Sequence, residues 1–158
     1  MRHTLTNWLG NRLPPKRPPD RIITHSEAEG PYMLRWFLIP RNRWFNIYCH
    51  EYHRDDDARA PHDHPWWSLS WVLRGVLREI LGREGKTRRL LQAGDIVWRK
   101  AEDAHRIEIA GDWVAPVTLF ITGPRLREWG FWCPGGRWVH WKQFTDPADV
   151  GKIGKGCE

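Results

Sequence analysis

The sequence has few cysteines and lacks a long apolar run. Its three cysteines, Cys49, Cys133 and Cys157, include no Cys-x-x-Cys pair. This spacing favours neither a disulfide framework nor a cysteine zinc site, so we expect three reduced thiols. Residues 1–10 contain no apolar stretch long enough for a signal peptide or a membrane helix. We therefore expect a cytoplasmic protein without a membrane partner.

The sequence also lacks a concentrated basic stripe, although its net charge is +6. The densest basic stretches, residues 11–21, 41–43 and 83–89, are short and interrupted. Nucleic-acid-binding proteins usually gather their Lys and Arg residues along one face. The 12 tryptophans could stack on bases, but the scattered charge is more typical of a solvated surface. We expect no nucleic-acid partner.

Long helical periodicity is absent, and the apolar pattern is that of an all-β protein. Short apolar or alternating runs are separated by Gly-containing turns at the spacing of sandwiches and barrels. The expected strands are 33–39, 44–53, 66–73, 76–81, 87–91, 96–98, 105–109 and 114–121, followed by a bent segment 131–144. With 158 residues the chain suits one domain. We divide it into an N-terminal arm (1–30), a barrel with a C-terminal hairpin (31–145) and a flexible tail (146–158).

The most informative motif is His62-Asp63-His64, which precedes one of the expected strands. Side chains two apart on a strand share a face, so His62 and His64 point the same way and Asp63 points away. A third histidine, His105, follows Gly94-Asp95 at a distance that a neighbouring strand could supply. The three imidazoles predict a metal site.

The strand after this motif is apolar on both faces. The set that shares the histidine face includes Trp66, Ser68 and Ser70, and the opposite set includes Trp67 and Trp71. A soluble monomer rarely exposes such an outer patch. We expect the N-terminal arm or a second copy of the chain to cover it, and a homodimer is the predicted assembly.

These residues resemble the cupin superfamily. Its first motif is a glycine, five residues, HxH, three or four residues, Glu, six residues and Gly. Here His62-Asp63-His64 is followed at those spacings by Ser68 and Gly75. Its second motif, G-x5-PxG-x2-H-x3-N, is matched in frame by Gly94 and His105.

Several residues depart from the cupin pattern. Ser68 stands at the position of the glutamate that usually supplies a fourth ligand, and Asp56 replaces the leading glycine. In the second motif Lys100 and Glu102 replace the proline and the glycine, and Ile109 replaces the asparagine. The resemblance covers residues 34–122, the barrel itself.

The resemblance implies an all-β, jelly-roll-like double-stranded β-helix that binds one divalent transition metal through His62, His64 and His105. Fe(II) is the metal it favours, and zinc, nickel, copper or manganese also suit imidazole ligands. The three-histidine set is similar to that of the thiol and β-diketone dioxygenases of the superfamily. Without a carboxylate ligand, the metal charge favours an anionic or chelating substrate. A non-haem iron dioxygenase acting on a small organic molecule is the expected function.

Other side chains are candidates for supporting roles. Tyr48 could supply a hydroxyl acid, Ser68 could hydrogen-bond a metal-bound water, and Trp66 could form a wall of the substrate pocket. His50 and His53 lie on opposite faces by parity, so at most one could face the site. Six further tryptophans are expected to fill core and interface: Trp98, Trp113, Trp129, Trp132, Trp138 and Trp141. Four arginines near the motif could bind a carboxylate: Arg54, Arg59, Arg74 and Arg106.

Two other functions stay open. A cupin can bind a metal or a small ligand without catalysis, because barrels are kept where chemistry is lost. A metal-independent sugar epimerase or isomerase would need a histidine base held by a carboxylate. The carboxylate of Asp63 points away from the histidine face, which weighs against that alternative.

Overall fold

A computed structural model describes residues 2–24, 30–57, 59–111, 114–148, 152 and 154–158. A few positions of the expected arm and of the expected tail lie outside these ranges. Trp113 also lies outside them. Among the described residues, no helix is long and apolar enough to cross a membrane.

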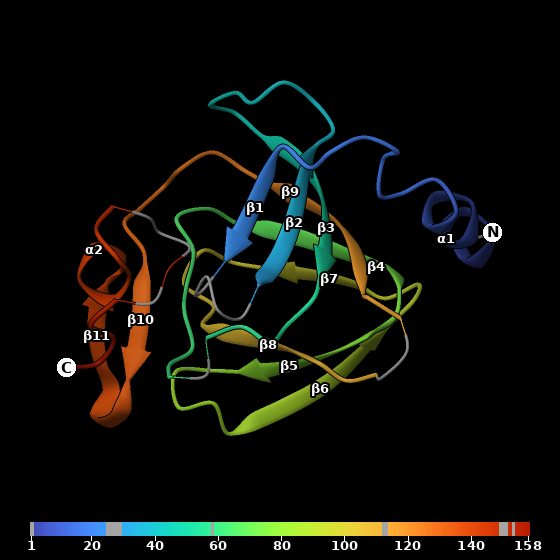
Figure 1. Cartoon of the computed structure of the whole chain (residues 1–158). Coiled ribbons are helices and arrows are strands. Elements are labelled where there is room, and N and C mark those ends of the chain that lie inside the picture. The colour runs from blue at the N-terminus through green and yellow to red at the C-terminus, as the bar shows by residue number, and fades with distance from the viewer. Residues whose placement is uncertain (1, 25–29, 58, 112–113, 149–151, 153) are drawn as a thin grey trace.

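Two antiparallel sheets face each other and form the barrel (Figure 1). The larger sheet has the strand order β1-β2-β3-β9-β4-β7, and the smaller has the order β6-β5-β8. The strands of the larger sheet are β1 (Arg21–Thr24), β2 (Pro31–Phe37), β3 (Asn46–Tyr52), β4 (Ser68–Arg74), β7 (Ile96–Arg99) and β9 (Val117–Thr122). Those of the smaller are β5 (Val76–Leu81), β6 (Thr87–Gln92) and β8 (His105–Ile109). The all-β, double-stranded β-helix prediction is confirmed.

The glycine that ends the first motif makes the passage from β4 to β5 possible. Gly75 has a positive φ of 73°, a conformation that residues with a Cβ rarely adopt. A Cβ built on it would also lie 2.8 Å from the Cα of Pro116. Any larger residue would therefore push the chain away from the neighbouring segment and misalign the two sheets.

The barrel interior is apolar. A buried cluster joins side chains of both sheets, namely Tyr32, Met33, Tyr52, Val72, Leu77, Leu91, Val97 and Ile107. Most of these side chains also line the cavity that contains the histidines.

The N-terminal arm covers the outer face of β4, one of the two coverings that we expected. It begins with a short helix, α1 (Arg2–Gly10), which the sequence pattern did not indicate. Thr6 accepts a hydrogen bond from Trp71 Nε1 at 3.2 Å, and Leu9 packs beside Leu73. β1 then pairs with β2 and extends the larger sheet. The arm thus covers the part of this face at Trp71 and Leu73, whereas Trp67 stacks on the exposed Trp98. The homodimer stays a prediction.

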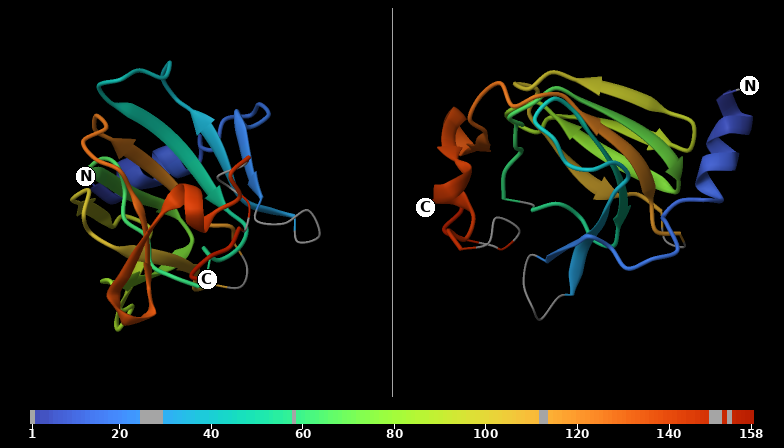
Figure 2. Two further views of the ribbon diagram at one scale, coloured as in Figure 1. Left: turned by 90° about the vertical axis from the view of Figure 1, so that its left-hand side faces the viewer. Right: turned by 90° about the horizontal axis from the view of Figure 1, so that it is seen from above.

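The C-terminal segment forms a separate small unit on the side of the barrel opposite α1 (Figures 1 and 2). β10 (Gly130–Cys133) and β11 (Arg137–His140) form a hairpin that α2 (Trp141–Phe144) follows. The buried Asp63 carboxylate fastens this unit, because it accepts hydrogen bonds from Gly130 N (2.8 Å) and Trp138 Nε1 (3.1 Å). As the alternation predicted, Asp63 points away from the histidine face.

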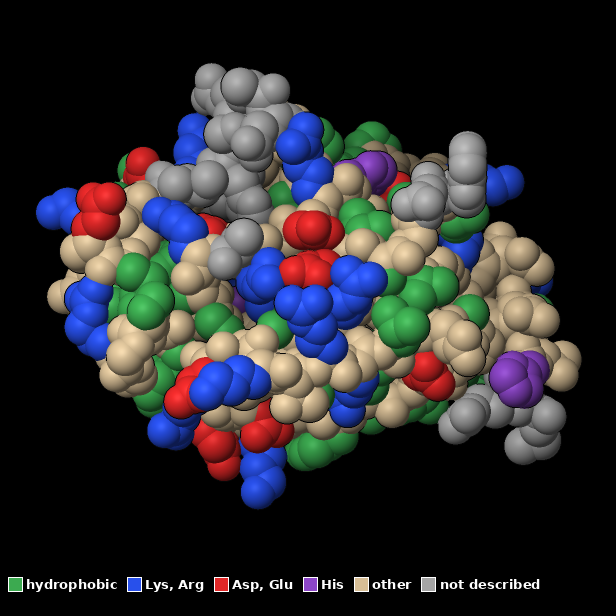
Figure 3. Space-filling model, turned by 90° about the horizontal axis from the view of Figure 1, so that it is seen from below, with side chains coloured by type: hydrophobic (Ala, Val, Ile, Leu, Met, Phe, Trp, Pro, Cys, Tyr) green, Lys and Arg blue, Asp and Glu red, His purple; other side chains and the backbone are tan. Residues whose placement is uncertain are grey.

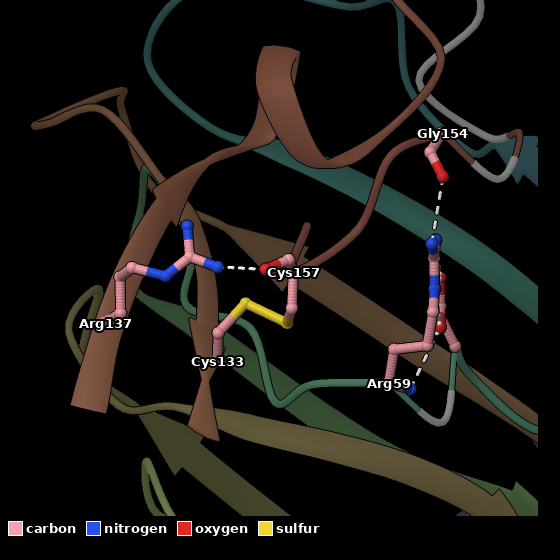
Figure 4. The surroundings of a disulfide bond; sticks show 6 residues. Arg59, Cys133, Arg137, Gly154 and Cys157 are labelled. Carbon is pink, nitrogen blue, oxygen red and sulfur yellow. Dashed lines mark hydrogen bonds and ion pairs between the residues drawn. A yellow bond between two sulfur atoms is a disulfide. The ribbon is translucent and has the colours of Figure 1, made fainter. Parts of the chain in front are cut away.

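A disulfide joins Cys133 of β10 to Cys157, so the expectation of three reduced thiols is wrong for these two residues (Figure 4). The chain folds back so that their Cα atoms lie 5.6 Å apart, within the usual disulfide range. The carbonyl of Cys157 accepts a hydrogen bond from Arg137, and that of Gly154 accepts one from Arg59 at 2.9 Å. Cys49 is buried and free. The expected domain division, with its flexible tail, stays a prediction.

The face of the molecule seen from below mixes charges of both signs (Figure 3). On the smaller sheet, Glu108 pairs with Arg78 at 3.3 Å and with Arg106 at 2.7 Å. Basic residues with acidic neighbours do not form the stripe that phosphate backbones bind. The expectation of no nucleic-acid partner stays a prediction.

Candidate metal centre

Three histidines converge at the open end of the barrel. His62 and His105 face each other in an isolated β-bridge, in which each backbone N–H donates to the other's carbonyl at 2.9 and 3.0 Å. His64 is held by a backbone bond to Ala101 O at 2.9 Å. One ring nitrogen from each histidine lies within 4.8 Å of the others. The backbone thus brings together the three residues that the sequence singled out.

Two of the three rings are oriented by carboxylates. Glu79 Oε1 accepts from His105 Nδ1 at 2.8 Å, and Asp56 Oδ2 lies 3.2 Å from His62 Nδ1. A ring nitrogen that donates to a carboxylate leaves Nε2 as the free lone pair, the arrangement found around metal-binding histidines. His64 Nε2 lies 2.8 Å from His105 Nε2. The rings therefore present Nε2 atoms to one another and to any shared cation.

Burial keeps the imidazoles of His64 and His105 neutral. It lowers the pKa of His64 well below the ordinary value, and the neighbouring His62 and His105 add to the shift. Burial and the charge of Arg99 together lower the pKa of His105 to about 4, against the opposing hydrogen bond to Glu79. Neutral imidazole is the form that donates a lone pair to a metal.

Glu79, on β5, connects the histidines to two arginines. Its carboxylate is 2.5 Å from Arg99 Nε and 2.6 Å from Arg89. Burial opposes its ionisation, but the hydrogen bond from His105 and the charge of Arg99 outweigh burial and hold the pKa of Glu79 well below its usual range. Arg99 also donates to Ser70 Oγ at 2.8 Å, which fixes the guanidinium.

A cavity of about 370 Å³ extends from the histidines between the two sheets. Its aromatic lining is Tyr32, Phe37, Tyr48, Tyr52, Trp66, Phe120, Trp129, Phe131 and Trp141. Its charged lining includes Arg21, Arg35, Arg41, Asp56, Asp57, Arg99, Arg125 and Lys152. Ligand sites commonly combine apolar walls with a few polar groups in this way, and this cavity is large enough for a small organic molecule.

The cavity includes two of the three supporting residues expected from the sequence. Trp66 lines it and stacks on His64 with ring centroids 6.5 Å apart. Tyr48 lines it on β3, where its ring contacts Phe37, His50 and Phe120. Ser68 is buried but does not line the cavity, whereas Ser70 and Val72 of the same parity do. The geometry gives no support to a role for Ser68 at the metal.

Other residues of the site escaped sequence reasoning. Trp129 and Trp141, which we expected in core or interface, line the cavity and stack on each other at 5.9 Å. Glu79 could have been found from the sequence, because it is an acidic residue between Leu77 and Leu81 on the same face of β5. Arg35 and His50 carry no such signal, because only the pairing of β2 with β3 places them opposite each other. None of the four arginines singled out near the motif lines the cavity.

A family model for the AraC-like ligand-binding domain matches residues 45–130. The chain belongs to this family. The match spans β3 to β9 and includes all three histidines. No curated protein matches the sequence.

Solved structures share the fold of this AraC-like ligand-binding domain at low identity. A double-stranded β-helix protein from Klebsiella pneumoniae has a TM-score of 0.52 and 18% identity over 71% of this chain and 91% of its own. An RmlC-like cupin from Ralstonia eutropha has a TM-score of 0.52 and 14% identity over 72% and 68%. A DMSP lyase from Ruegeria pomeroyi has a TM-score of 0.51 and 18% identity over 68% and 55%. These likenesses confirm the cupin fold and assign no activity.

Proposed function

We propose that this domain binds one divalent transition metal through His62, His64 and His105 and oxidises a small organic substrate with dioxygen. The observation that carries the proposal is the convergence of three imidazoles, two of which have Nδ1 held by carboxylates. The donor set fits a first-row metal, because imidazole suits iron, zinc, copper and nickel. Fe(II) is the metal proposed, and it would supply a centre at which substrate and dioxygen meet.

The chain's own residues supply orientation and exclusion of water. Glu79 and Asp56 fix the tautomers of His105 and His62, so Nε2 of each ring stays free of a proton. Trp66 and Trp129 both stack on His64, with ring centroids 6.5 Å away in each case, and shield the histidines from bulk solvent. A dry, aromatic cavity strengthens the electrostatic contacts of a bound substrate.

The AraC-like family match supports a second function, binding of a small ligand without catalysis. The same cavity and the same histidines would serve, and the two functions differ only in turnover. An epimerase is less well supported. Glu79 and Asp56 supply the carboxylate partners that Asp63 does not, but a ring with a pKa of about 4, as in His105, is a weak general base at neutral pH.

Elemental analysis of protein purified without added metal tests the proposal, followed by oxygen uptake against thiols, β-diketones and hydroxylated aromatic acids. One iron per chain with substrate-dependent oxygen uptake supports the oxygenase. Bound metal without uptake on the whole panel supports the binding function. If the wild type takes up no metal, even from added Fe(II), Zn(II) or Ni(II), both proposals of a metal centre are contradicted.

A further inference from the structure

Arg35 is a cation of the cavity without a counter-charge. It lies on β2 and lines the cavity beside Tyr48, with its guanidinium carbon 5.1 Å from the ring centroid. Its one hydrogen bond among the described residues runs from Nε to His50 Nε2 at 2.9 Å. No carboxylate of the described chain pairs with it, so its two terminal nitrogens are available to a ligand. Burial lowers the pKa of Arg35, as expected for a guanidinium without an acidic neighbour.

The acidic groups of the cavity are engaged elsewhere. Asp56 faces His62 at 3.2 Å, and Asp57 is held by Arg59 at 2.7 Å. The other buried guanidinium, Arg99, is neutralised by Glu79. A buried charge is costly to leave unpaired, so the cavity favours a ligand that brings a negative charge to Arg35.

His50 reinforces this preference through its tautomer. Arg35 Nε only donates, so His50 Nε2 must accept, and the neutral ring then carries its proton on Nδ1. That Nδ1 is buried and has no hydrogen-bond partner. Burial and the charge of Arg35 lower the pKa of His50 well below its ordinary value, so the ring stays neutral. The pair therefore contains donors and a positive charge but no free acceptor.

We propose that Arg35 binds the carboxylate of an organic ligand, with its two terminal nitrogens in a bidentate contact and the ligand body against the aromatic wall of Tyr48 and Phe120. A single guanidinium beside a neutral imidazole matches one carboxylate in charge and in planar shape. The apolar wall favours an organic acid over an inorganic anion. The inference deepens the proposed function by naming the substrate class, and rests on it only in taking the same cavity as the ligand site.

Calorimetry on metal-free protein tests the inference with two probes of nearly equal shape, 3-phenylpropanoate and its neutral amide, 3-phenylpropanamide. The wild type is expected to bind the acid and to prefer it to the amide. Arg35→Met should weaken binding of the acid about ten- to hundredfold, the range for a charged hydrogen-bonded contact. Arg35→Lys should restore part of the loss. Arg88→Met, which removes an exposed arginine of β6 outside the cavity, is the matched control and should change nothing.

Three results would overturn the inference: equal affinity for acid and amide, unchanged affinity in Arg35→Met, or no binding of the acid up to its solubility limit. Circular dichroism confirms that each variant is folded. The use of metal-free protein separates this inference from the metal proposal, because binding of the acid there does not depend on a metal ion. Acid binding that His105→Ala removes and Arg35→Met preserves would place the anion at the histidines instead.

Discussion

Two histidines of the same cavity, His105 and His50, have partners of opposite charge. Glu79 accepts from Nδ1 of His105, which leaves Nε2 as a lone pair directed at the other histidines. Arg35 donates to Nε2 of His50, which leaves a proton on Nδ1. The sign of the partner thus decides which ring nitrogen is free and whether that region suits a cation or an anion. Under the two proposals, one cavity would hold a metal cation at the histidines and the carboxylate of a ligand at Arg35.

The strongest test of the cation-binding region is removal of a ligand. His105→Ala is expected to abolish stoichiometric metal binding, because two imidazoles on one short segment define only an edge of a coordination sphere. The fold should survive, since the barrel has its own apolar core. Metal titration with circular dichroism measures both effects. His53→Ala is the matched control, because His53 is exposed and does not line the cavity. Equal stoichiometry in His105→Ala and the wild type would remove His105 from the centre.

Glu79→Gln removes the negative partner and keeps the side-chain volume. Metal affinity should fall by about 10- to 100-fold, the usual effect of losing a group that orients a ligand. The variant should also lose about 3–5 kcal/mol of stability, because the buried Arg99 keeps its charge without a counter-ion. Chemical denaturation and metal titration measure the two losses separately. Wild-type values for both would show that Glu79 does not set the tautomer of His105.

Removal of the disulfide tests whether the histidine region and the Arg35 region of the cavity both depend on the C-terminal hairpin. Cys157→Ser opens the link to Cys133, which closes a loop with a sequence separation of 24, and should cost about 3 kcal/mol. The hairpin that it secures carries Phe131, whose ring lies 5.6 Å from that of His62, whereas no residue of the hairpin contacts Arg35 among the described interactions. Metal affinity should therefore fall more than affinity for the carboxylate probe. Equal losses would mean that the hairpin supports the whole cavity.

The sequence predicted the convergence of His62, His64 and His105 far better than the pairing of Arg35 with His50. The parity of His62 and His64 and the spacing to His105 sufficed for the first, because local strand geometry determines which side chains share a face. The second depends on β2 pairing with β3 in one register, which places Arg35 opposite His50 across 15 residues of chain. No local pattern encodes that register. Likewise, Cys133 and Cys157 meet only because the chain end returns to the hairpin.

Alternation predicted the inward face of β4 but not which of its side chains reach the cavity. The parity of His62 and His64 persists past the bend at residues 65–66, because Ser70 and Val72 line the same cavity. Ser68 shares this parity and is buried, but it does not line the cavity, whereas Ser70 accepts a hydrogen bond from Arg99 there. Strand parity thus identifies the face that side chains share, and tertiary packing determines which of them reach the cavity.

The smallest expected effect is the pH dependence that His50 contributes to stability. Its folded pKa is lowered by burial, so between that pKa and the ordinary value of 6.5 the unfolded chain holds a proton that the folded chain does not. Stability must therefore fall as the pH drops below 6.5, by about 1.4 kcal/mol per pH unit for this one group. His50→Gln keeps an acceptor for Arg35 and removes the titration, so metal-free His50→Gln should lose stability less steeply between pH 6.5 and 5 than the wild type. Denaturant unfolding across that range measures both slopes, and His53→Gln, at an exposed position, should keep the wild-type slope. If the slope of His50→Gln equals that of the wild type, His50 is not held neutral by its place beside Arg35, and the contrast between the two regions fails at its anion-binding end.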